Sequence, residues 1–184
     1  EKSAFLPKNN RPKKFINPME VLKTKNDWAP ADWVAVGIAT AGGAGLAPKA
    51  PGTAGSIVGV LIYLLIEALH AGAYYPHAII FFFIVGIWAS SRVEHLWGHD
   101  AQRIVIDEVV GQMITFVVAA GRYQLSAFYI LLGFGLFRLF DIVKPFPIRR
   151  LERLQGGLGV VADDVGAGVY ALAVLTLVRY IFIR

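Results

Sequence analysis

The sequence predicts an all-α membrane protein, a polytopic helical bundle of about five transmembrane helices plus a short re-entrant or interfacial helix. Hydrophobic residues make up 56% of the 184 residues, and the mean hydropathy of +0.56 is well above that of a soluble domain. Several apolar runs approach the roughly 20 residues that a helix needs to cross a bilayer. The chain has no cysteine, which excludes disulfides, thiolate metal sites and cysteine nucleophiles.

The first element is a basic tail over residues 1–32, expected to be partly disordered or surface-lying, ahead of a membrane-embedded domain over residues 33–184. The tail carries seven basic residues, Lys2, Lys8, Arg11, Lys13, Lys14, Lys23 and Lys25. Such charge favours the cytoplasmic face of an anionic membrane. Residues 33–47 follow and are apolar, but as a helix they reach only about 22 Å against roughly 30 Å of hydrocarbon. This segment either dips into the membrane and returns or lies along the interface.

Crossings of the membrane are then expected over five segments, 56–72, 74–91, 108–121, 125–143 and 165–183. With the tail inside and 33–47 returning to its own side, 14 of the 18 Lys and Arg residues lie inside. The positive-inside rule favours this arrangement, whereas a full crossing by 33–47 would separate the tail from the basic loops. The same topology places the charged motifs described next at one membrane face.

The motif RLFDIVKP ends an apolar segment with Arg138, Asp141 and Lys144. Their i, i+3, i+6 spacing predicts one gently turning stripe on a helix, which Pro145 and Pro147 then stop. Charges inside a span are costly and usually face a bundle interior or a wet cavity. The alternative is an arginine that snorkels to the interface and forms an intrahelical ion pair.

Two pairs of adjacent acids open two further spans. Asp107 and Glu108 precede an apolar run in which Gly111 would let another element approach Asp107 closely, and Asp163 and Asp164 stand between glycines. Acids at a helix start also interact with the helix dipole or cap the helix, which is the plainer interpretation. Together with Asp141, these carboxylates could hold a hard cation, and Mg²⁺ fits because it takes one or two carboxylates plus phosphate and water.

The stretch APKAPGTAGS combines Lys49 with small residues and with Thr53 and Ser56 at an expected helix start. Backbone N–H groups at such a start bind phosphate, although an ordinary polar turn would look the same. A Walker loop is excluded because GxxxxGK[ST] is missing. Carboxylates for a metal and cations for an anion indicate metal-assisted phosphoryl chemistry, and their place at a membrane face suggests a lipid-borne phosphate.

Four blocks of the sequence resemble the phosphatidylglycerophosphatase A family over about residues 33–183. In chain order they are GLAPKAPGTAGS, VIDEVVGQ, FRLFDIVKPFPIRRLE and GGLGVVADDVGAGVYA. The resemblance implies a Mg²⁺-dependent phosphoric monoester hydrolase of the bacterial inner membrane, with its active site at the cytoplasmic face. Such an enzyme removes the terminal phosphate of phosphatidylglycerophosphate, giving phosphatidylglycerol and inorganic phosphate in phospholipid biosynthesis.

The resemblance also implies roles for individual residues. The metal-binding and catalytic acids would be Asp107, Glu108, Asp141, Asp163 and Asp164. The phosphate ligands would be Arg138, Lys144, Lys49, Thr53 and Ser56, although Lys49 stands where the family commonly has another residue. Metal-activated water is the favoured nucleophile, and a covalent aspartyl-phosphate stays open although the DxDx[TV] arrangement is missing. We expect a lipid substrate and a membrane as partners and no nucleic acid; the sequence leaves the oligomeric state open.

Three other functions were weighed against this one. A lipid phosphatase with a histidine nucleophile would need a PSGH block, and a CDP-alcohol phosphotransferase would need its DG-x2-AR signature; neither is present. A small transporter or channel would spread its acids through the depth of the bilayer, whereas here they are expected at one edge.

Overall fold

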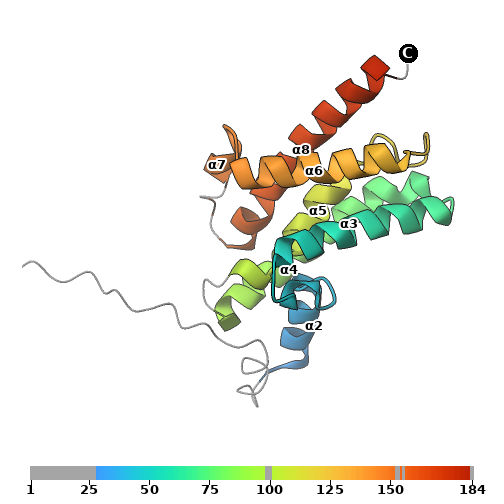
Figure 1. Ribbon diagram of the computed structural model, residues 1–184. Coiled ribbons are helices and arrows are strands. Elements are labelled where there is room, and N and C mark those ends of the chain that lie inside the picture. The colour runs from blue at the N-terminus through green and yellow to red at the C-terminus, as the bar shows by residue number, and fades with distance from the viewer. Residues whose placement is uncertain (1–27, 98–100, 152–153, 155, 183–184) are drawn as a thin grey trace, which may run out of the picture.

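The computed structural model describes residues 28–97, 101–151, 154 and 156–182, and every regular element in these ranges is helical (Figure 1). The predicted all-α fold is therefore confirmed for this part of the chain. The basic tail lies outside the described residues up to residue 27. In chain order the elements are α2 (Pro30–Ala39), η1 (Ala44–Leu46), α3 (Pro51–Ala68), η2 (Gly72–Tyr74), α4 (Tyr75–Trp97), η3 (Ala101–Arg103), α5 (Ile106–Thr115), α6 (Ala127–Val143), α7 (Ile148–Leu151) and α8 (Gly157–Phe182).

Three of the described helical segments are long and apolar enough to cross a membrane. They are α3, the 26-residue stretch Gly72–Trp97 that contains α4, and α8. These correspond to the predicted crossings 56–72, 74–91 and 165–183. Helix α6 has 17 residues and is about 25 Å long, so it reaches most of the way across the hydrocarbon of a bilayer.

The segment predicted as the crossing 108–121 is a short helix followed by turns. Helix α5 has ten residues and ends at Thr115, which gives it a length of only about 15 Å. Beyond it, the amides of Phe116 and Val117 donate to carbonyls three residues back rather than four, so the chain tightens out of the α-helix. The expectation of a single helix over 108–121 was wrong, because the chain leaves α-helical geometry after Thr115 and continues in turns up to Gly121, whose φ is positive.

The chain from α5 to Gly121 nevertheless runs beside α3 over the whole length of that helix. A methyl group on Gly52, at the start of α3, would meet Glu108, and one on Gly59 would lie 2.8 Å from Cβ of Gln112. Past the end of α3, Gly72 packs directly on Gly121, whose amide donates to Oε1 of Glu67 at 2.8 Å. The segment therefore passes from one end of the bundle to the other.

Helix α5 is the centre of the bundle, with α3, α4, α6 and α8 packed around it (Figure 1). Its apolar side chains Val109, Val110 and Met113 are buried. At one point of the contact with α8 backbone meets backbone, because Gly168 lies against the carbonyl of Gly111. A methyl group on Gly111 would lie 2.6 Å from the carbonyl oxygen of Asp164, so the predicted close approach at Gly111 is confirmed, and the approaching element is α8.

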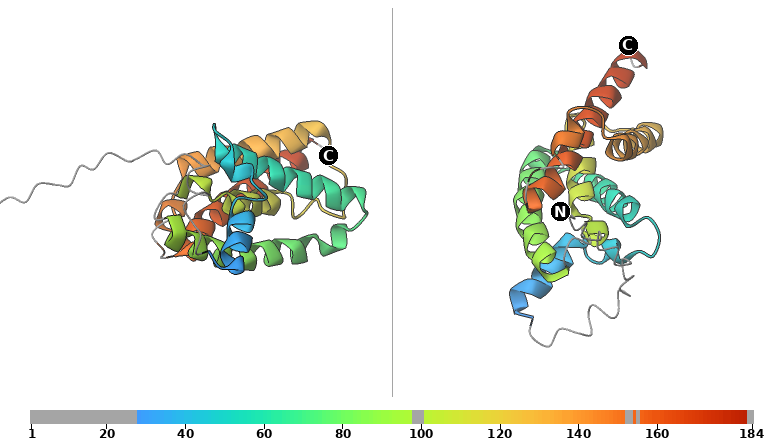
Figure 2. Two further views of the ribbon diagram at one scale, coloured as in Figure 1. Left: turned by 90° about the horizontal axis from the view of Figure 1, so that it is seen from below. Right: turned by 90° about the vertical axis from the view of Figure 1, so that its left-hand side faces the viewer.

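Helix α2 and the turn that follows it stay at one end of the bundle, so residues 33–47 do not pass to the other end. It packs beside the last part of α4 (Figure 2), where Nε of Arg92 lies 2.6 Å from Oδ1 of Asp32. Gly42 and Gly43, both with positive φ, turn the chain back after the helix, and η1 leads to the start of α3. We call this end the polar end; α3, α5 and α8 begin there, and α4 and α6 finish there.

We predict that Gly111→Ala destabilises the protein by about 1–3 kcal/mol, because the added methyl group overpacks the contact with α8 and the ring of Phe137. Gly135→Ala on exposed α6 is the matched control, since nothing lies within 4 Å of a methyl group there. The control should gain up to about 1 kcal/mol through helix propensity. Thermal unfolding followed by circular dichroism in detergent measures both, and equal stability of the two variants would contradict the packing described here.

Candidate metal-binding and anion-binding site

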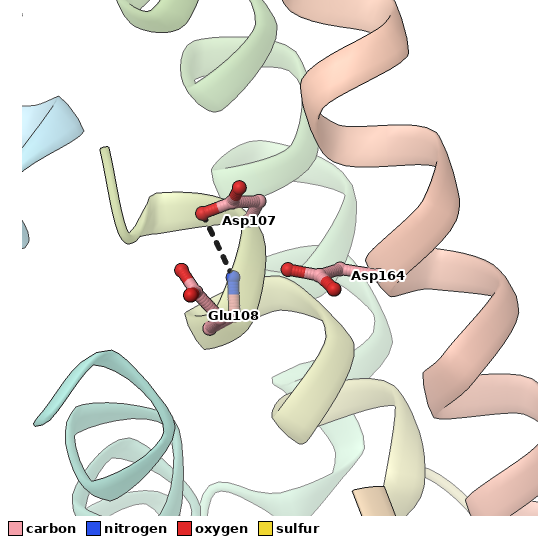
Figure 3. A group of neighbouring side chains, drawn as sticks. All are labelled: Asp107, Glu108 and Asp164. Atoms are coloured by element: carbon pink, nitrogen blue, oxygen red, sulfur yellow. Dashed lines mark hydrogen bonds between the residues drawn. The ribbon is translucent and has the colours of Figure 1, made fainter. Parts of the chain in front are cut away.

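Three carboxylates from two helices meet at the polar end. Asp107 and Glu108 lie in the first turn of α5, and Asp164 reaches them from α8 (Figure 3). Each offers an oxygen atom, and these oxygens all lie within 4.8 Å of one another. Asp107 and Asp164 are buried, with 9% and 4% of their surfaces exposed. We call Asp107, Glu108 and Asp164 the acidic triad.

The triad forms because two local features coincide. The start of α5 leaves Asp107 and Glu108 near the helix end, where the amide of Glu108 donates to Oδ1 of Asp107 at 3.1 Å. The glycine contact between α5 and α8 then brings Asp164 within reach of both. Burial raises the pKa of Asp107 well above its ordinary value, and the neighbouring carboxylates of Glu108 and Asp164 raise it further. A cation among the three would favour their charged forms.

Arg138 on α6 joins the triad to two other helices. Its Nη1 lies 2.7 Å from Oδ2 of Asp141 and 3.9 Å from Oε1 of Glu108. The same atom donates to Oγ of Ser56 on α3 at 3.4 Å. Three helices, α3, α5 and α6, thus place a polar group beside this one guanidinium, which keeps a fifth of its side-chain surface exposed.

Lys144 departs from the stripe that the sequence predicted. Helix α6 ends at Val143, and Lys144 adopts a left-handed backbone conformation with φ of 46°, so it does not continue the i, i+3, i+6 pattern. Pro145 disfavours helical geometry at the preceding residue, which explains the break. The turn sends Nζ of Lys144 to Oδ2 of Asp163 at 2.6 Å. Arg138 and Asp141 pair along the helix, which is the ion pair of the alternative interpretation.

The predicted acids therefore separate into two groups. Asp107, Glu108 and Asp164 face one another, whereas Asp141 and Asp163 each pair with a cation; Asp141 also lies within hydrogen-bonding reach of Asp164. Neighbours on a helix point about 100° apart, so Asp163 and Asp164 cannot both face α5. Oδ1 of Asp163 is buried and has no hydrogen-bond partner within the described part of the chain.

Of the residues that the sequence indicated at the start of α3, only Ser56 contacts another residue of the site, through its hydrogen bond from Arg138. Ser56 is buried and donates to the carbonyl of Gly52, while Thr53 is half-buried and Lys49 is exposed before the helix. The amides of Thr53 and Ala54 donate to the carbonyl of Ala50, so these two groups are not free for phosphate.

Gly52 is the site residue that sequence reasoning did not single out. Its missing side chain makes room for Glu108 and Arg138, and a methyl group there would lie 3.2 Å from Nη1 of Arg138. The run of small residues in PGTAGS does predict that another part of the chain packs closely here, but it does not indicate which part.

The fold and this site define a class: an all-helical protein with long apolar helices and a buried acidic cluster, flanked by arginine and lysine, that could hold a metal ion. The sequence model of the phosphatidylglycerophosphatase A family matches residues 37–179. The chain belongs to this family.

Curated relatives agree over most of their lengths. Phosphatidylglycerophosphatase A of Haemophilus influenzae is 37% identical over 166 residues, covering 89% of this chain and 96% of the relative. Phosphatidylglycerophosphatase A of Escherichia coli is 32% identical over 162 residues, or 86% and 87% of the two chains. A Bacteroides thetaiotaomicron protein with the provisional name phosphatidylinositol-3-phosphatase is 38% identical over 148 residues, or 78% and 92%. No solved structure matches this chain.

Proposed function

We propose that this protein hydrolyses the terminal phosphomonoester of phosphatidylglycerophosphate, releasing phosphatidylglycerol and inorganic phosphate, as a step of phospholipid biosynthesis. The observation that carries the proposal is the family match over residues 37–179, with two relatives named for this activity. The polar end supports it, because acids and cations there are combined as phosphate chemistry requires.

Mg²⁺ is the proposed cofactor, and the acidic triad would hold it. Three carboxylate oxygens within 4.8 Å of one another suit a hard cation with oxygen ligands, and Oε2 of Glu108 is buried without a hydrogen-bond partner among the described residues. The ion would polarise the phosphoryl group and neutralise charge that develops on its oxygens. Substrate phosphate and water would complete its ligand shell.

The cationic side chains would bind and orient the phosphate. Arg138 presents a planar fork suited to phosphate oxygens, and Asp141 fixes its direction from one turn away. Lys144 is held at the polar end by its ion pair with Asp163. Ser56 donates no bond to Arg138 but accepts one from it, and Thr53 in the first turn of α3 and Lys49 just before it would contact the headgroup.

Water is the proposed nucleophile. Its oxygen forms a bond to phosphorus, the ester bond between phosphorus and the glycerol oxygen breaks, and a proton ends on that oxygen. The carboxylates Asp107, Glu108, Asp141, Asp163 and Asp164 orient the water and accept or return the proton; an aspartyl-phosphate is the alternative. The separation of the acids into a triad and two ion pairs favours the triad for contact with the reacting groups.

A second candidate substrate is phosphatidylinositol 3-phosphate. It is favoured by the relative that is 38% identical over 92% of its own length and provisionally named for that lipid. Both substrates are phosphomonoesters on a lipid headgroup, so the same residues would serve, and only the groups that contact the headgroup would differ.

We propose five crossings of the bacterial inner membrane, with the polar end at the cytoplasmic face. The course of residues 108–121 beside α3 supports the third crossing, and α6 between the two ends supports the fourth. Helix α2 remaining at the polar end supports the arrangement in which the basic tail and the basic loops share one side.

The proposed activity predicts phosphate release from phosphatidylglycerophosphate by the purified protein in detergent, abolished by EDTA and restored by added Mg²⁺. Phosphatidic acid and phosphatidylinositol 3-phosphate are assayed beside it, and we expect at least about tenfold lower kcat/KM for both, equivalent to about 1.4 kcal/mol. Faster turnover of the inositol lipid would favour the second candidate. Full activity in EDTA would remove the metal from the proposal.

Loss of any triad carboxylate should lower turnover by at least about 100-fold, since several kcal/mol of transition-state stabilisation are removed. The variants are Asp107→Asn, Glu108→Gln and Asp164→Asn. Asp141 and Asp163 each pair with a cationic side chain, so Asp141→Asn and Asp163→Asn should lower turnover less. Glu67→Gln is the matched control at the opposite end of α3, where the amide oxygen can still accept from Gly121. A triad variant as active as this control would exclude that residue.

The topology predicts that the two ends of the bundle label from opposite sides of the membrane. Because the chain has no cysteine, single cysteines replace the exposed Arg122, at the far end, and Arg149, at the polar end. A membrane-impermeant maleimide should reach Arg122→Cys in spheroplasts and Arg149→Cys only in inverted vesicles. Labelling of both from one side would refute the five crossings.

A further inference from the structure

Gln112 is a buried polar residue that the proposed chemistry leaves unused. Its side chain is fully buried, and neither Nε2 nor Oε1 has a hydrogen-bond partner among the described residues. An amide inside an apolar bundle loses its hydration without replacement, so burying it in this way is costly. The residues that surround the amide of Gln112 should therefore include the group with which it forms hydrogen bonds.

We infer from the geometry of α5 that the side chain of Gln112 is directed toward the acidic triad. It lies four residues after Glu108 on α5, so the two share one face of the helix. Long side chains on a helix lean back toward its N-terminus, which directs the amide of Gln112 to the turn that carries Glu108. Gly59 of α3 leaves room for this path: a methyl group there would lie 2.8 Å from Cβ and 3.1 Å from Cγ of Gln112.

Gln112 and its neighbour Gly59 each lie about one helical turn after a residue of the site. Gly59 follows Ser56 by one turn of α3, and Ser56 accepts the hydrogen bond from Arg138. Glu108 directs Oε1 toward Arg138 at 3.9 Å, while its other oxygen, Oε2, is buried and unpartnered within the described part of the chain. An amide with donors and a carboxylate oxygen that lacks one thus share the same helix face, one turn apart.

We propose that Gln112 is a positioning residue for Glu108. Nε2 donates to Oε2 of Glu108 through one water, and thereby holds the carboxylate with Oε1 turned to the other triad oxygens and Arg138. The inference rests on the proposed function in one respect, namely that the triad binds a divalent cation. Hydrogen bonds that orient a metal ligand in this way typically change metal affinity or activity by about 10- to 100-fold.

The test measures Mn²⁺ binding by electron paramagnetic resonance on the full chain in detergent, without lipid substrate. Gln112→Met keeps the size of the side chain and removes the amide, and we expect Mn²⁺ to bind about 10- to 100-fold more weakly. Thr115→Val is the matched control, a buried polar residue on α5 whose hydroxyl donates to the carbonyl of Gly111, and it should stay within about twofold of the parent. In a Glu108→Gln background, Gln112→Met should have no further effect, because its action passes through Glu108.

Three results would overturn the inference: parent-like Mn²⁺ affinity in Gln112→Met, equal weakening in Thr115→Val, or an undiminished effect in the Glu108→Gln background. If Gln112→Met does not fold, Gln112→Asn, which withdraws the amide by one methylene, is judged by the same criteria.

A wrong assignment of the lipid substrate would not affect this test, because no lipid is present. If the parent binds no Mn²⁺, the metal proposal fails instead, and phosphate release decides: kcat should fall in Gln112→Met with KM unchanged, and an unchanged kcat would refute the role of Gln112.

Discussion

The contact between α5 and α8 through Gly111 and Gly168 is the interaction on which the site depends. Between apolar helices in a membrane there is little hydrophobic drive to associate, and small residues allow the close backbone approach that favours packing. Here that approach sets the distance from Asp164 to Asp107 and Glu108. A side chain in the interface would hold the helices apart and leave three isolated carboxylates instead of one site.

Charge balance accounts for the rest of the polar end. Isolated charges are costly in an apolar bundle, so each is expected to have a partner. Asp141 and Asp163 have Arg138 and Lys144, while the triad has only the more distant Arg138 among described residues. When its carboxylates are ionised, the triad carries more negative charge than Arg138 balances, and a divalent cation could neutralise the excess. The two cationic side chains could in turn bind an anion. This complementarity explains how one arrangement can serve a lipid phosphomonoester, and why the family match and the geometry agree.

The two ends of the bundle differ in what their polar groups do. Near the far end, Glu67 accepts the amide of Gly121 and the guanidinium of Arg179 lies over the ring of Tyr123, so the polar groups there close loops. In and next to the candidate site, buried oxygens of Glu108 and Asp163 and the amide of Gln112 lack partners among the described residues, as does the hydroxyl of Tyr63 farther along α3. Unpartnered groups beside a cluster of carboxylates are the expected sign of a site that a ligand completes.

Apolar runs, glycines and the placement of charge were enough to predict a helical membrane protein, its three longest spans, the close approach at Gly111 and the family. These features depend on the hydropathy and backbone freedom of neighbouring residues, so they can be recognised from the sequence alone. The early end of α5, the left-handed turn at Lys144, the blocked amides of Thr53 and Ala54 and the separation of five acids into a triad and two ion pairs were decided only by tertiary structure. Each depends on which neighbour competes for a side chain or amide, and that competition exists only once distant helices have packed.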